Sequence, residues 1–358
     1  MPHRLTLRKK KGKPGQVYYP LQLHAVPKPV PGPGELLVKI EAAALNHRDY
    51  FIRQHLYPQI SFDAALFSDG CGTVVELGPG CSARGAALLH QSVILTPCRG
   101  WGTDPDGPED YSAFSSLGGT EPFTDLGCGQ TYVAVHEDEV EPTPAHLTAA
   151  EGATIPSCGL TAWRALVTKS GNALPGRNVL VTGIGGGVAL QVLQFAVALG
   201  LRVYVTSSSP AKIERAVRQL GARAGVVYRG DDEWHKKLAA MLPPDRPYLD
   251  AIIDGAGGDI VIKGMTMLKP GGVIACYGMT TAPVMDWPMQ AVLKNIELRG
   301  STLGSRTEFT DMVRFIGQHK IVPVISRSVK GLDCVDAIET LFDDLKVGSQ
   351  FGKLVIEY

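Results

Sequence analysis

The stretch 178–220 constrains the fold of this chain most strongly. A short apolar run, 178–182, precedes the glycine cluster 183–189, and an uncharged helical segment then leads to a second apolar run at 201–206. Because glycine has no Cβ, such a cluster allows a tight turn, and backbone N–H groups at the start of the helix can approach a pyrophosphate closely. Strand, glycine turn, helix and strand within about 30 residues are typical of the βαβ unit that binds dinucleotides.

The glycine cluster fits two spacings of a phosphate-binding turn. It is either Gly183-x-Gly185 or Gly183-x-x-Gly186-x-x-Ala189. An ordinary tight turn is the alternative, but the flanking strand and helix signals favour a cofactor site. The residues from which we expect cofactor contacts here are Gly183, Gly185, Gly186, Gly187 and Val188.

The end of the second apolar run indicates which dinucleotide binds. NAD sites usually place an Asp or Glu there to bind the ribose 2′-hydroxyl. In this chain, the first acidic residue after the run 201–206 is Glu214. The hydroxyls of Ser207 and Ser208 and the ammonium of Lys212 suit the charge and acceptor oxygens of a 2′-phosphate, so we expect NADPH. Ser209-Pro210 is also a typical helix start, and both interpretations can hold together.

The composition is that of a globular chain with two domains of ordinary size. Its 358 residues are 44% hydrophobic and 20% charged, and Lys+Arg and Asp+Glu both number 35. This balance gives no overall field to attract nucleic acid or an acidic membrane. We expect neither a signal peptide nor a membrane span, and seven cysteines without regular spacing favour reduced thiols. We therefore expect a cytoplasmic protein with a small-molecule substrate and no nucleic-acid or membrane partner.

Two kinds of sequence alternate along the rest of the chain. Residues 1–155 are rich in Pro and Gly and carry short β-like runs, which predicts an irregular, barrel-like β domain. From 156 to 298, apolar runs alternate with helical segments, which predicts a doubly wound parallel sheet. The last 60 residues hold one helical pattern, 309–319, and two strand-like runs, 322–329 and 353–358. We expect this tail to complete the first domain.

Two further turns follow predicted strands of the parallel sheet. Residues 254–258 end one apolar run, and Tyr277-Gly278 ends the next. Ligands of open α/β sheets bind at the carboxyl edge of the strands. We therefore expect Gly255, Tyr277 and Gly278 to lie near the cofactor.

The order of four segments resembles the medium-chain dehydrogenase/reductase superfamily nearly end to end. These segments are Ala44–Asp49 with Tyr57-Pro58, Asp69–Gly78, Gly159–Ala165 and Val181–Ala189. The resemblance implies an α/β protein in which a GroES-like β-barrel catalytic domain, residues 1–155 and 299–358, is interrupted by a Rossmann domain, residues 156–298. It also implies hydride transfer to or from a nicotinamide in the cleft between the domains.

The same resemblance implies further cofactor contacts and a partner. Thr161 would bind the nicotinamide carboxamide, and Tyr228 would contact the 2′-phosphate unless it is only an aromatic residue at a strand end. Leu303, Gly304 and Ser305 would border the nicotinamide. A homodimer would pair through the strand near 296–299.

Three of the four positions that bind the catalytic zinc in the alcohol dehydrogenase branch carry other residues here, and only Cys158 matches. That branch uses a Cys, a His-Glu pair and a second Cys. The corresponding residues of this chain are Asn46, Ser68, Asp69 and Cys158. One thiolate cannot assemble the three-ligand open site of a catalytic zinc, so we expect no metal.

Without a Lewis acid, reduction of a conjugated acceptor is easier than oxidation of a plain alcohol. The chain resembles the zinc-free quinone oxidoreductase and enoyl reductase branch, in which hydride goes to an activated C=C or a quinone. Hydrogen-bond donors can hold the oxygen on which charge develops. The resemblance implies Asn46 as that donor and Tyr57 as the proton donor.

Each of these roles has an alternative. Asn46 can instead hold its loop through side-chain-to-backbone bonds. Tyr57 can be a packing residue, and His55 is an alternative proton donor. At the level of function, the alternatives are a zinc-free carbonyl or alcohol oxidoreductase and a non-catalytic NADPH-binding protein.

Overall fold

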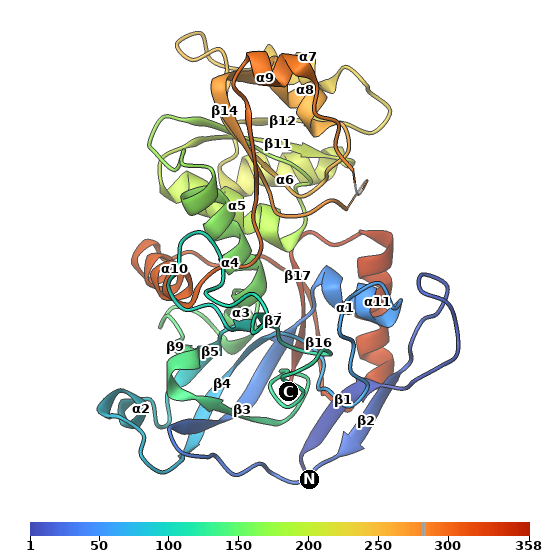
Figure 1. Ribbon diagram of the computed structural model, residues 1–358, viewed down its shortest axis with the longest axis vertical. Coiled ribbons are helices and arrows are strands. Elements are labelled where there is room, and N and C mark those ends of the chain that lie inside the picture. The colour runs from blue at the N-terminus through green and yellow to red at the C-terminus, as the bar shows by residue number, and fades with distance from the viewer. Residues whose placement is uncertain (281, 283) are drawn as a thin grey trace. The chain divides into compact units, whose positions relative to one another are not determined.

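Two compact units make up the chain in the computed structural model, which describes residues 1–280, 282 and 284–358 (Figure 1). Unit 1 comprises Met1–Cys158 and Ser305–Tyr358, and unit 2 comprises Gly159–Gly304. The sequence analysis places the two boundaries a few residues earlier, at 155/156 and 298/299. The second boundary lies later because the last strand of the unit 2 sheet continues to Gly300.

A parallel sheet in the order β12-β11-β10-β13-β14-β15 forms the centre of unit 2. The strands are β10 (Asn178–Val181), β11 (Arg202–Ser207), β12 (Ala224–Val227), β13 (Leu249–Asp254), β14 (Leu268–Cys276) and β15 (Glu297–Gly300). The helices are α5 (Gly187–Ala198), α6 (Pro210–Leu220), α7 (Trp234–Ala239), α8 (Ile260–Met267) and α9 (Met289–Leu293), after a π-helical turn at Arg164–Lys169. Figure 1 shows α5 and α6 on one face of the sheet and α7, α8 and α9 on the other. This is the predicted doubly wound arrangement, and its strand order reverses between β10 and β13.

The central strands of unit 2 are buried because helices cover both faces of the sheet. All residues of β10 and β13 are buried. The core packed around them includes Leu180, Tyr204 and Ile252. The helix after β11 begins at Pro210 with Ser209 as its N-cap, and it ends at Gly221, whose φ of 81° is left-handed. The sequence signals for strand, turn and helix therefore agree with the structure throughout this region.

A mixed sheet in the order β16-β17-β3-β4-β5-β9 forms the centre of unit 1, with β8 also paired to β3. The strands of unit 1 are β1 (His3–Leu7), β2 (Leu21–Ala25), β3 (Glu35–Ala44), β4 (Asp69–Leu77), β5 (Ser92–Leu95), β6 (Cys98–Arg99), β7 (Ser115–Ser116), β8 (Tyr132–His136), β9 (Val140–Pro142), β16 (Ile325–Lys330) and β17 (Lys353–Glu357). Its helices are α1 (His47–Arg53), α2 (Ala83–Ala87), α3 (Ala149–Gly152), α10 (Arg306–His319) and α11 (Val335–Val347), with a 3₁₀ turn at Glu137–Glu139. Helix α4 (Pro156–Trp163) contains the first boundary between the units. The C-terminal tail joins the N-terminal sheet through β17, as the sequence analysis expects.

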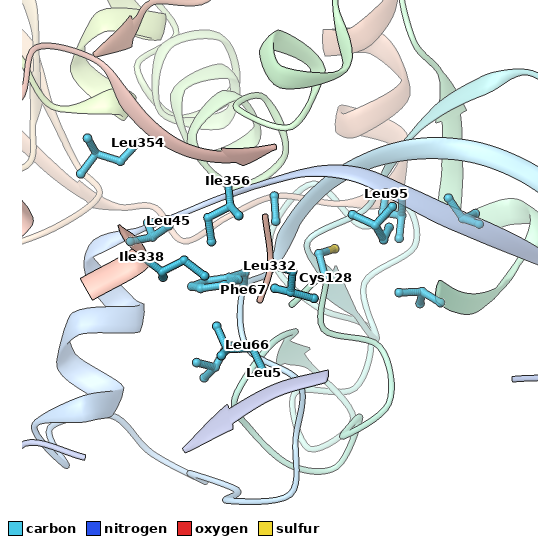
Figure 2. Packing of buried hydrophobic residues seen from close by; sticks show 14 of the residues in the cluster. Leu5, Leu45, Leu66, Phe67, Leu95, Cys128, Leu332, Ile338, Leu354 and Ile356 are labelled. Atoms are coloured by element: carbon cyan, nitrogen blue, oxygen red, sulfur yellow. The ribbon is translucent and has the colours of Figure 1, made fainter. Parts of the chain in front are cut away.

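Two helices, and not one, lie in the C-terminal tail. The sequence pattern predicted a single helix, within α10, and this prediction was incomplete because α11 is a second helix. Helix α11 buries Ile338, Leu341 and Phe342 in the unit 1 core, where Phe342 lies 6.4 Å from Phe67 between ring centroids. Figure 2 shows Ile338 and Phe67 close together in this core. The apolar spacing in α11 has the helical i, i+3, i+4 pattern, so the signal is present in the sequence.

No helix in the described part of the chain combines the length and apolar character needed to cross a membrane. All seven cysteines are free thiols. Five of them are buried, among them Cys128 in the unit 1 core (Figure 2).

Candidate active site

Strand pairing in unit 1 brings together the residues at the ends of three strands. In the antiparallel pair β17–β3, Val355 lies opposite Ala44, so Lys353 lies opposite Asn46, just beyond the end of β3. In the antiparallel pair β3–β4, Ala44 also lies opposite Asp69. The register of a continuous sheet therefore places Asn46, Asp69 and Lys353 side by side.

The ammonium of Lys353 is the centre of a buried hydrogen-bond network. Its Nζ donates to Oδ1 of Asn46 at 2.6 Å and to Oδ2 of Asp69 at 3.0 Å. Lys353 is 4% exposed and Asp69 is fully buried. Burial works to lower the pKa of Lys353, but the Asp69 carboxylate outweighs it and the net pKa is raised. The side chain therefore stays charged at neutral pH.

The other groups of the network come from β4 and the start of α4. Oδ1 of Asp69 accepts hydrogen bonds from Ser68 Oγ and from the backbone N–H of Ser157, both at 3.0 Å. The Nδ2 of Asn46 donates to Ser68 Oγ at 3.3 Å, and the Cys158 thiol donates to Oδ1 of Asn46 at 3.4 Å. Both oxygens of the buried Asp69 carboxylate are thus hydrogen-bonded, as a charged group away from water requires.

This set of donors does not fit a catalytic zinc. The four positions supply one thiol, one carboxylate, one amide and one hydroxyl, whereas catalytic zinc takes three ligands from Cys, His and Asp or Glu. The Lys353 ammonium already bonds to the carboxylate and to the amide oxygen, where a second cation would be repelled. Among the described residues, no three His, Cys, Asp or Glu side chains are grouped so that they could hold a metal ion.

Helix α1 fixes the backbone of Asn46. The N–H of Asn46 donates to Oδ2 of Asp49 at 2.7 Å, which satisfies an N-terminal donor of the helix. Asp49 is fully buried, and its Oδ1 lies 3.8 Å from Nη1 of Arg48. Burial raises the pKa of Asp49 to about 6, although the Arg48 charge opposes the change.

Tyr57 packs against the guanidinium of Arg48. The Arg48 Cζ lies 4.7 Å from the centroid of the Tyr57 ring, and Arg48 also donates to the carbonyl oxygens of Leu117 and Gly118 at 2.5 and 2.8 Å. Burial works to raise the pKa of Tyr57, but Arg48 and a hydrogen bond with Ser116 outweigh it, so the net pKa is lowered. Arg48 therefore couples Tyr57 to the helix that begins at Asn46.

His55, the alternative proton donor, has a different environment. Its Nδ1 lies 2.7 Å from the hydroxyl of Tyr19, which is 4% exposed in the unit 1 core. The backbone of His55 has a φ of 57°. These contacts tie His55 to the chain segment that connects β1 and β2.

In unit 2, the glycine turn has the backbone geometry that the sequence predicts. Gly183 has a φ of 66° and Gly185 a φ of 121°, values that residues with a side chain rarely adopt. Gly186 is the N-cap of α5, and Gly187 and Val188 form its first turn. The backbone amides at this helix start are thus available to a phosphate.

The residues predicted to bind a 2′-phosphate gather beside that turn. A Cβ on Gly185 would lie 2.7 Å from Cδ of Lys212, so the lysine stem packs on the turn itself. The hydroxyl of Ser207 donates to the carbonyl oxygen of Ile184 at 3.2 Å, and Ser208 follows it, partly exposed. The N–H of Tyr228 donates to the carbonyl oxygen of Ser207 at 3.1 Å, and Tyr228 is exposed. One corner of the sheet therefore holds Ser207, Ser208, Lys212 and Tyr228.

The carboxyl ends of β13 and β14 carry the next predicted group. Oδ1 of Asp254 accepts a hydrogen bond from the Thr182 hydroxyl at 2.6 Å, which joins the ends of β10 and β13. A Cβ on Gly255 would lie 2.5 Å from the ring of Tyr277, so the ring covers this glycine closely. Gly278 follows, and its carbonyl oxygen accepts from the Cys276 thiol at 3.2 Å. These residues line the strand-order reversal where ligands of such sheets bind.

The remaining predicted cofactor residues occupy both units. Thr161 is a buried residue of α4 in unit 2. Leu303, with a left-handed φ of 39°, and Gly304 end unit 2. Ser305 begins unit 1 as the N-cap of α10, where its hydroxyl accepts from the Glu308 N–H at 3.1 Å and its own N–H donates to the Glu308 carboxylate at 2.8 Å. The capping box therefore already uses the polar groups of Ser305.

Lys353 is the residue that the sequence analysis missed. Its contact with Asn46 spans 307 positions and arises only from the pairing of β17 with β3. The available signal was a lysine directly before the apolar residues Leu354–Ile356 of a strand-like run. A lysine in a fully buried strand must be paired, and that requirement points to a buried carboxylate.

Comparisons with known proteins agree with this architecture. The alcohol dehydrogenase GroES-like domain family matches residues 32–145, and the zinc-binding dehydrogenase family matches residues 187–318. The zinc-type alcohol dehydrogenase-like protein YogA of Leptosphaeria maculans is 65% identical over 358 residues, which cover both chains completely. The acryloyl-coenzyme A reductase of Metallosphaera sedula is 27% identical over 91% of this chain and 94% of its own length. A crystal structure of an NAD-dependent alcohol dehydrogenase is 27% identical, with a TM-score of 0.83 and 99% of each chain covered.

The fold, the glycine turn and the polar cluster define an oxidoreductase with a Rossmann-type cofactor unit. The chain belongs to the medium-chain dehydrogenase/reductase superfamily. The predicted combination of a GroES-like domain and a Rossmann domain is thereby confirmed. The match to the zinc-binding dehydrogenase family lies outside all four positions that correspond to zinc ligands, Asn46, Ser68, Asp69 and Cys158.

Replacement of Asp49 by asparagine should remove one pH dependence of stability. The pKa of Asp49 rises from 3.8 to about 6 on folding, so the folded state binds this proton more readily. The stability that the protonated group contributes is complete below pH 3.8 and is lost as the pH rises through about 6. Between pH 4.5 and pH 7.5, we expect the unfolding free energy of the wild type to fall by about 2 kcal/mol more than that of Asp49→Asn. Urea unfolding of both proteins measures this difference, and identical pH profiles would contradict it.

Proposed function

We propose that this protein is a zinc-independent, NADPH-dependent reductase that transfers hydride to an activated C=C of an enone or enoyl compound, or to a quinone. One observation carries the proposal. Where the alcohol dehydrogenase branch has zinc ligands, Asn46 and Asp69 bind the ammonium of Lys353. A site already occupied by a cation of the chain favours chemistry in which hydrogen-bond donors, and not a Lewis acid, stabilise the charge on oxygen.

In the reduction of an enone by this site, one side chain stabilises the substrate oxygen and another donates the proton. When bound, NADPH supplies the hydride, which adds to the β-carbon while the C=C electron pair shifts and negative charge develops on the carbonyl oxygen. The Nδ2–H of Asn46 donates to that oxygen. The hydroxyl of Tyr57 then gives a proton to the α-carbon and is reprotonated from water, which balances the reduction. Its lowered pKa beside Arg48 makes Tyr57 a stronger acid than an ordinary tyrosine.

The relatives include both reaction types, so a carbonyl or alcohol oxidoreductase is the second candidate. Relatives named alcohol dehydrogenases favour it, whereas the acryloyl-coenzyme A reductase favours reduction of a conjugated C=C. A plain alcohol requires stabilisation of a full alkoxide, for which the site offers an amide and no metal ligand set. The donor set therefore favours the conjugated acceptor.

Product analysis with deuterated cofactor tests the proposed reaction. We expect 2-cyclohexenone and NADPH deuterated at C4 to give cyclohexanone with deuterium at the β-carbon, and we expect no stoichiometric zinc by elemental analysis. Asn46→Ala should lower kcat by about 10²-fold, because it removes one donor to the developing oxyanion. An allylic alcohol as product would support the carbonyl reductase instead. Stoichiometric zinc with loss of activity on chelation would contradict zinc independence.

We propose NADPH as the cofactor because of the corner beside the glycine turn. Ser207, Ser208 and Lys212 lie there, and β11 ends in Ser207 without a carboxylate for a ribose 2′-hydroxyl. Lys212→Ala should raise the Kd of NADPH by about 10- to 100-fold, the usual worth of a charge-assisted hydrogen bond, and change that of NADH little. Fluorescence titration measures both constants. Lys236→Ala, on the exposed face of α7, is the matched control, and equal losses for both cofactors would contradict the assignment.

We propose a homodimer that pairs through β15. This strand is at one end of the unit 2 sheet, and Leu298 on it and Leu293 before it are 41% and 72% exposed. An edge strand with unpaired backbone groups is a template for pairing with a second copy, and these exposed leucines would be covered by it. Leu298→Lys should convert the dimer to a monomer in light scattering, whereas Leu174→Lys, at a similarly exposed leucine of unit 2, should not. A monomeric wild type would contradict the proposal.

A further inference from the structure

We propose that the buried Lys353 ammonium is a positioning residue of the reductase: it holds the Asn46 carboxamide with its oxygen inward, so that the amide N–H is presented to the oxygen of the substrate. This inference rests on the proposed function and names the group on which the oxygen-binding donor depends.

The lysine determines which way the amide faces. An ammonium can only donate hydrogen bonds, so the Asn46 atom 2.6 Å from Lys353 Nζ must be the carbonyl oxygen. The Cys158 thiol donates to the same oxygen at 3.4 Å. The oxygen of the amide is therefore saturated by two groups of the buried cluster, and the flipped amide would place its NH₂ group against the ammonium.

The nitrogen of the amide keeps a hydrogen for a ligand. Nδ2 carries two N–H donors, and within the described residues one of them has a partner, Ser68 Oγ at 3.3 Å. Asn46 itself is partly exposed, whereas Lys353 is buried. Asn46 thus lies at the margin of the buried cluster, and its second N–H is the one that a substrate oxygen can use.

The charge of Lys353 also strengthens that donor. A hydrogen bond from a cation to the amide oxygen polarises the amide and makes its N–H a better donor, since successive hydrogen bonds reinforce each other in a low-dielectric site. The gain is largest when the substrate oxygen becomes negative, so it acts in the transition state more than in the ground state. The contact raises the rate of hydride transfer more than it raises substrate affinity.

A purely structural role for Lys353 would require only its ion pair with Asp69. As a counter-ion, it needs only the 3.0 Å contact with that carboxylate, which Ser68 and Ser157 already hold in place. The bond to Asn46 is the shorter of its two contacts, at 2.6 Å. The two roles differ in what happens to Asn46 when the charge pair is removed.

A double-mutant cycle separates the two roles. Lys353→Met with Asp69→Asn removes both charges together, so no lone charge stays buried. In single-turnover reduction of 2-cyclohexenone with saturating NADPH, we expect this pair to slow hydride transfer by about tenfold or more, while the Kd of NADPH stays within about twofold. Adding Asn46→Ala should then cost about tenfold or less, although Asn46→Ala alone costs about 10²-fold, because both changes act on the same donor.

A second ion pair of unit 1, with a buried arginine and a partly exposed glutamate, provides the control. Arg53 is 1% exposed and binds Glu339 through two bonds at 2.8 and 2.6 Å. Arg53→Met with Glu339→Gln makes the same kind of change away from Asn46, so it should not slow hydride transfer. If the Lys353→Met, Asp69→Asn variant does not fold, Lys353→Gln replaces it, because glutamine keeps a hydrogen-bond donor but not the charge. Hydride transfer is then compared with and without Asn46→Ala in the Lys353→Gln protein.

Each outcome decides one of the two proposals. Unchanged hydride transfer in the folded Lys353 pair, or losses that simply multiply with Asn46→Ala, would overturn the positioning role and leave the reductase intact. A wild type that reduces neither 2-cyclohexenone nor benzoquinone would overturn the proposed function, and this inference with it. Slowed transfer with non-additive losses supports both.

Discussion

Pairing of β17 with β3 is the interaction on which the candidate substrate site depends. It joins the C-terminal strand to the N-terminal sheet with Val355 opposite Ala44, and it thereby completes unit 1 from two segments that flank unit 2 in the sequence. Because strand register is fixed along the whole ladder, the same pairing places Lys353 beside Asn46. A shift of one residue would turn the Lys353 side chain to the opposite face of the sheet, away from Asp69.

Two buried ion pairs of unit 1 lie on either side of Asn46. Lys353 is matched by Asp69, and Asp49 by the nearby Arg48. Buried ion pairs contribute little net stability, because desolvation offsets their attraction, but they fix geometry strongly. Here they orient the backbone and the side chain of Asn46 from two sides, through Asp49 and Lys353. The cluster is therefore better explained by orientation of a donor than by stabilisation of the fold.

Local sequence patterns predict the structure of unit 2 better than that of unit 1. The glycine turn needs left-handed φ values at Gly183 and Gly185, a requirement of the residues themselves, so the sequence could identify it. The same holds for Ser209-Pro210 at the start of α6 and for the apolar strands β10 and β13. In unit 1, short strands separated by Pro and Gly predict the class of domain but not which strands are neighbours, since pairing there joins segments far apart in the chain.

The sequence by itself determined the βαβ unit and the return of the tail to the first domain, whereas the loss of zinc ligands at Asn46, Ser68 and Asp69 is a prediction from the family resemblance. These features depend on residue type, spacing and order, which can be read without coordinates. Only the tertiary structure revealed Lys353 as the partner of Asn46 and Asp69, and Arg48 as the partner of Tyr57. Helix α11 was encoded in the sequence and overlooked, but the lysine contact was not, because the distance between two side chains 307 positions apart is set by sheet register and not by any local pattern.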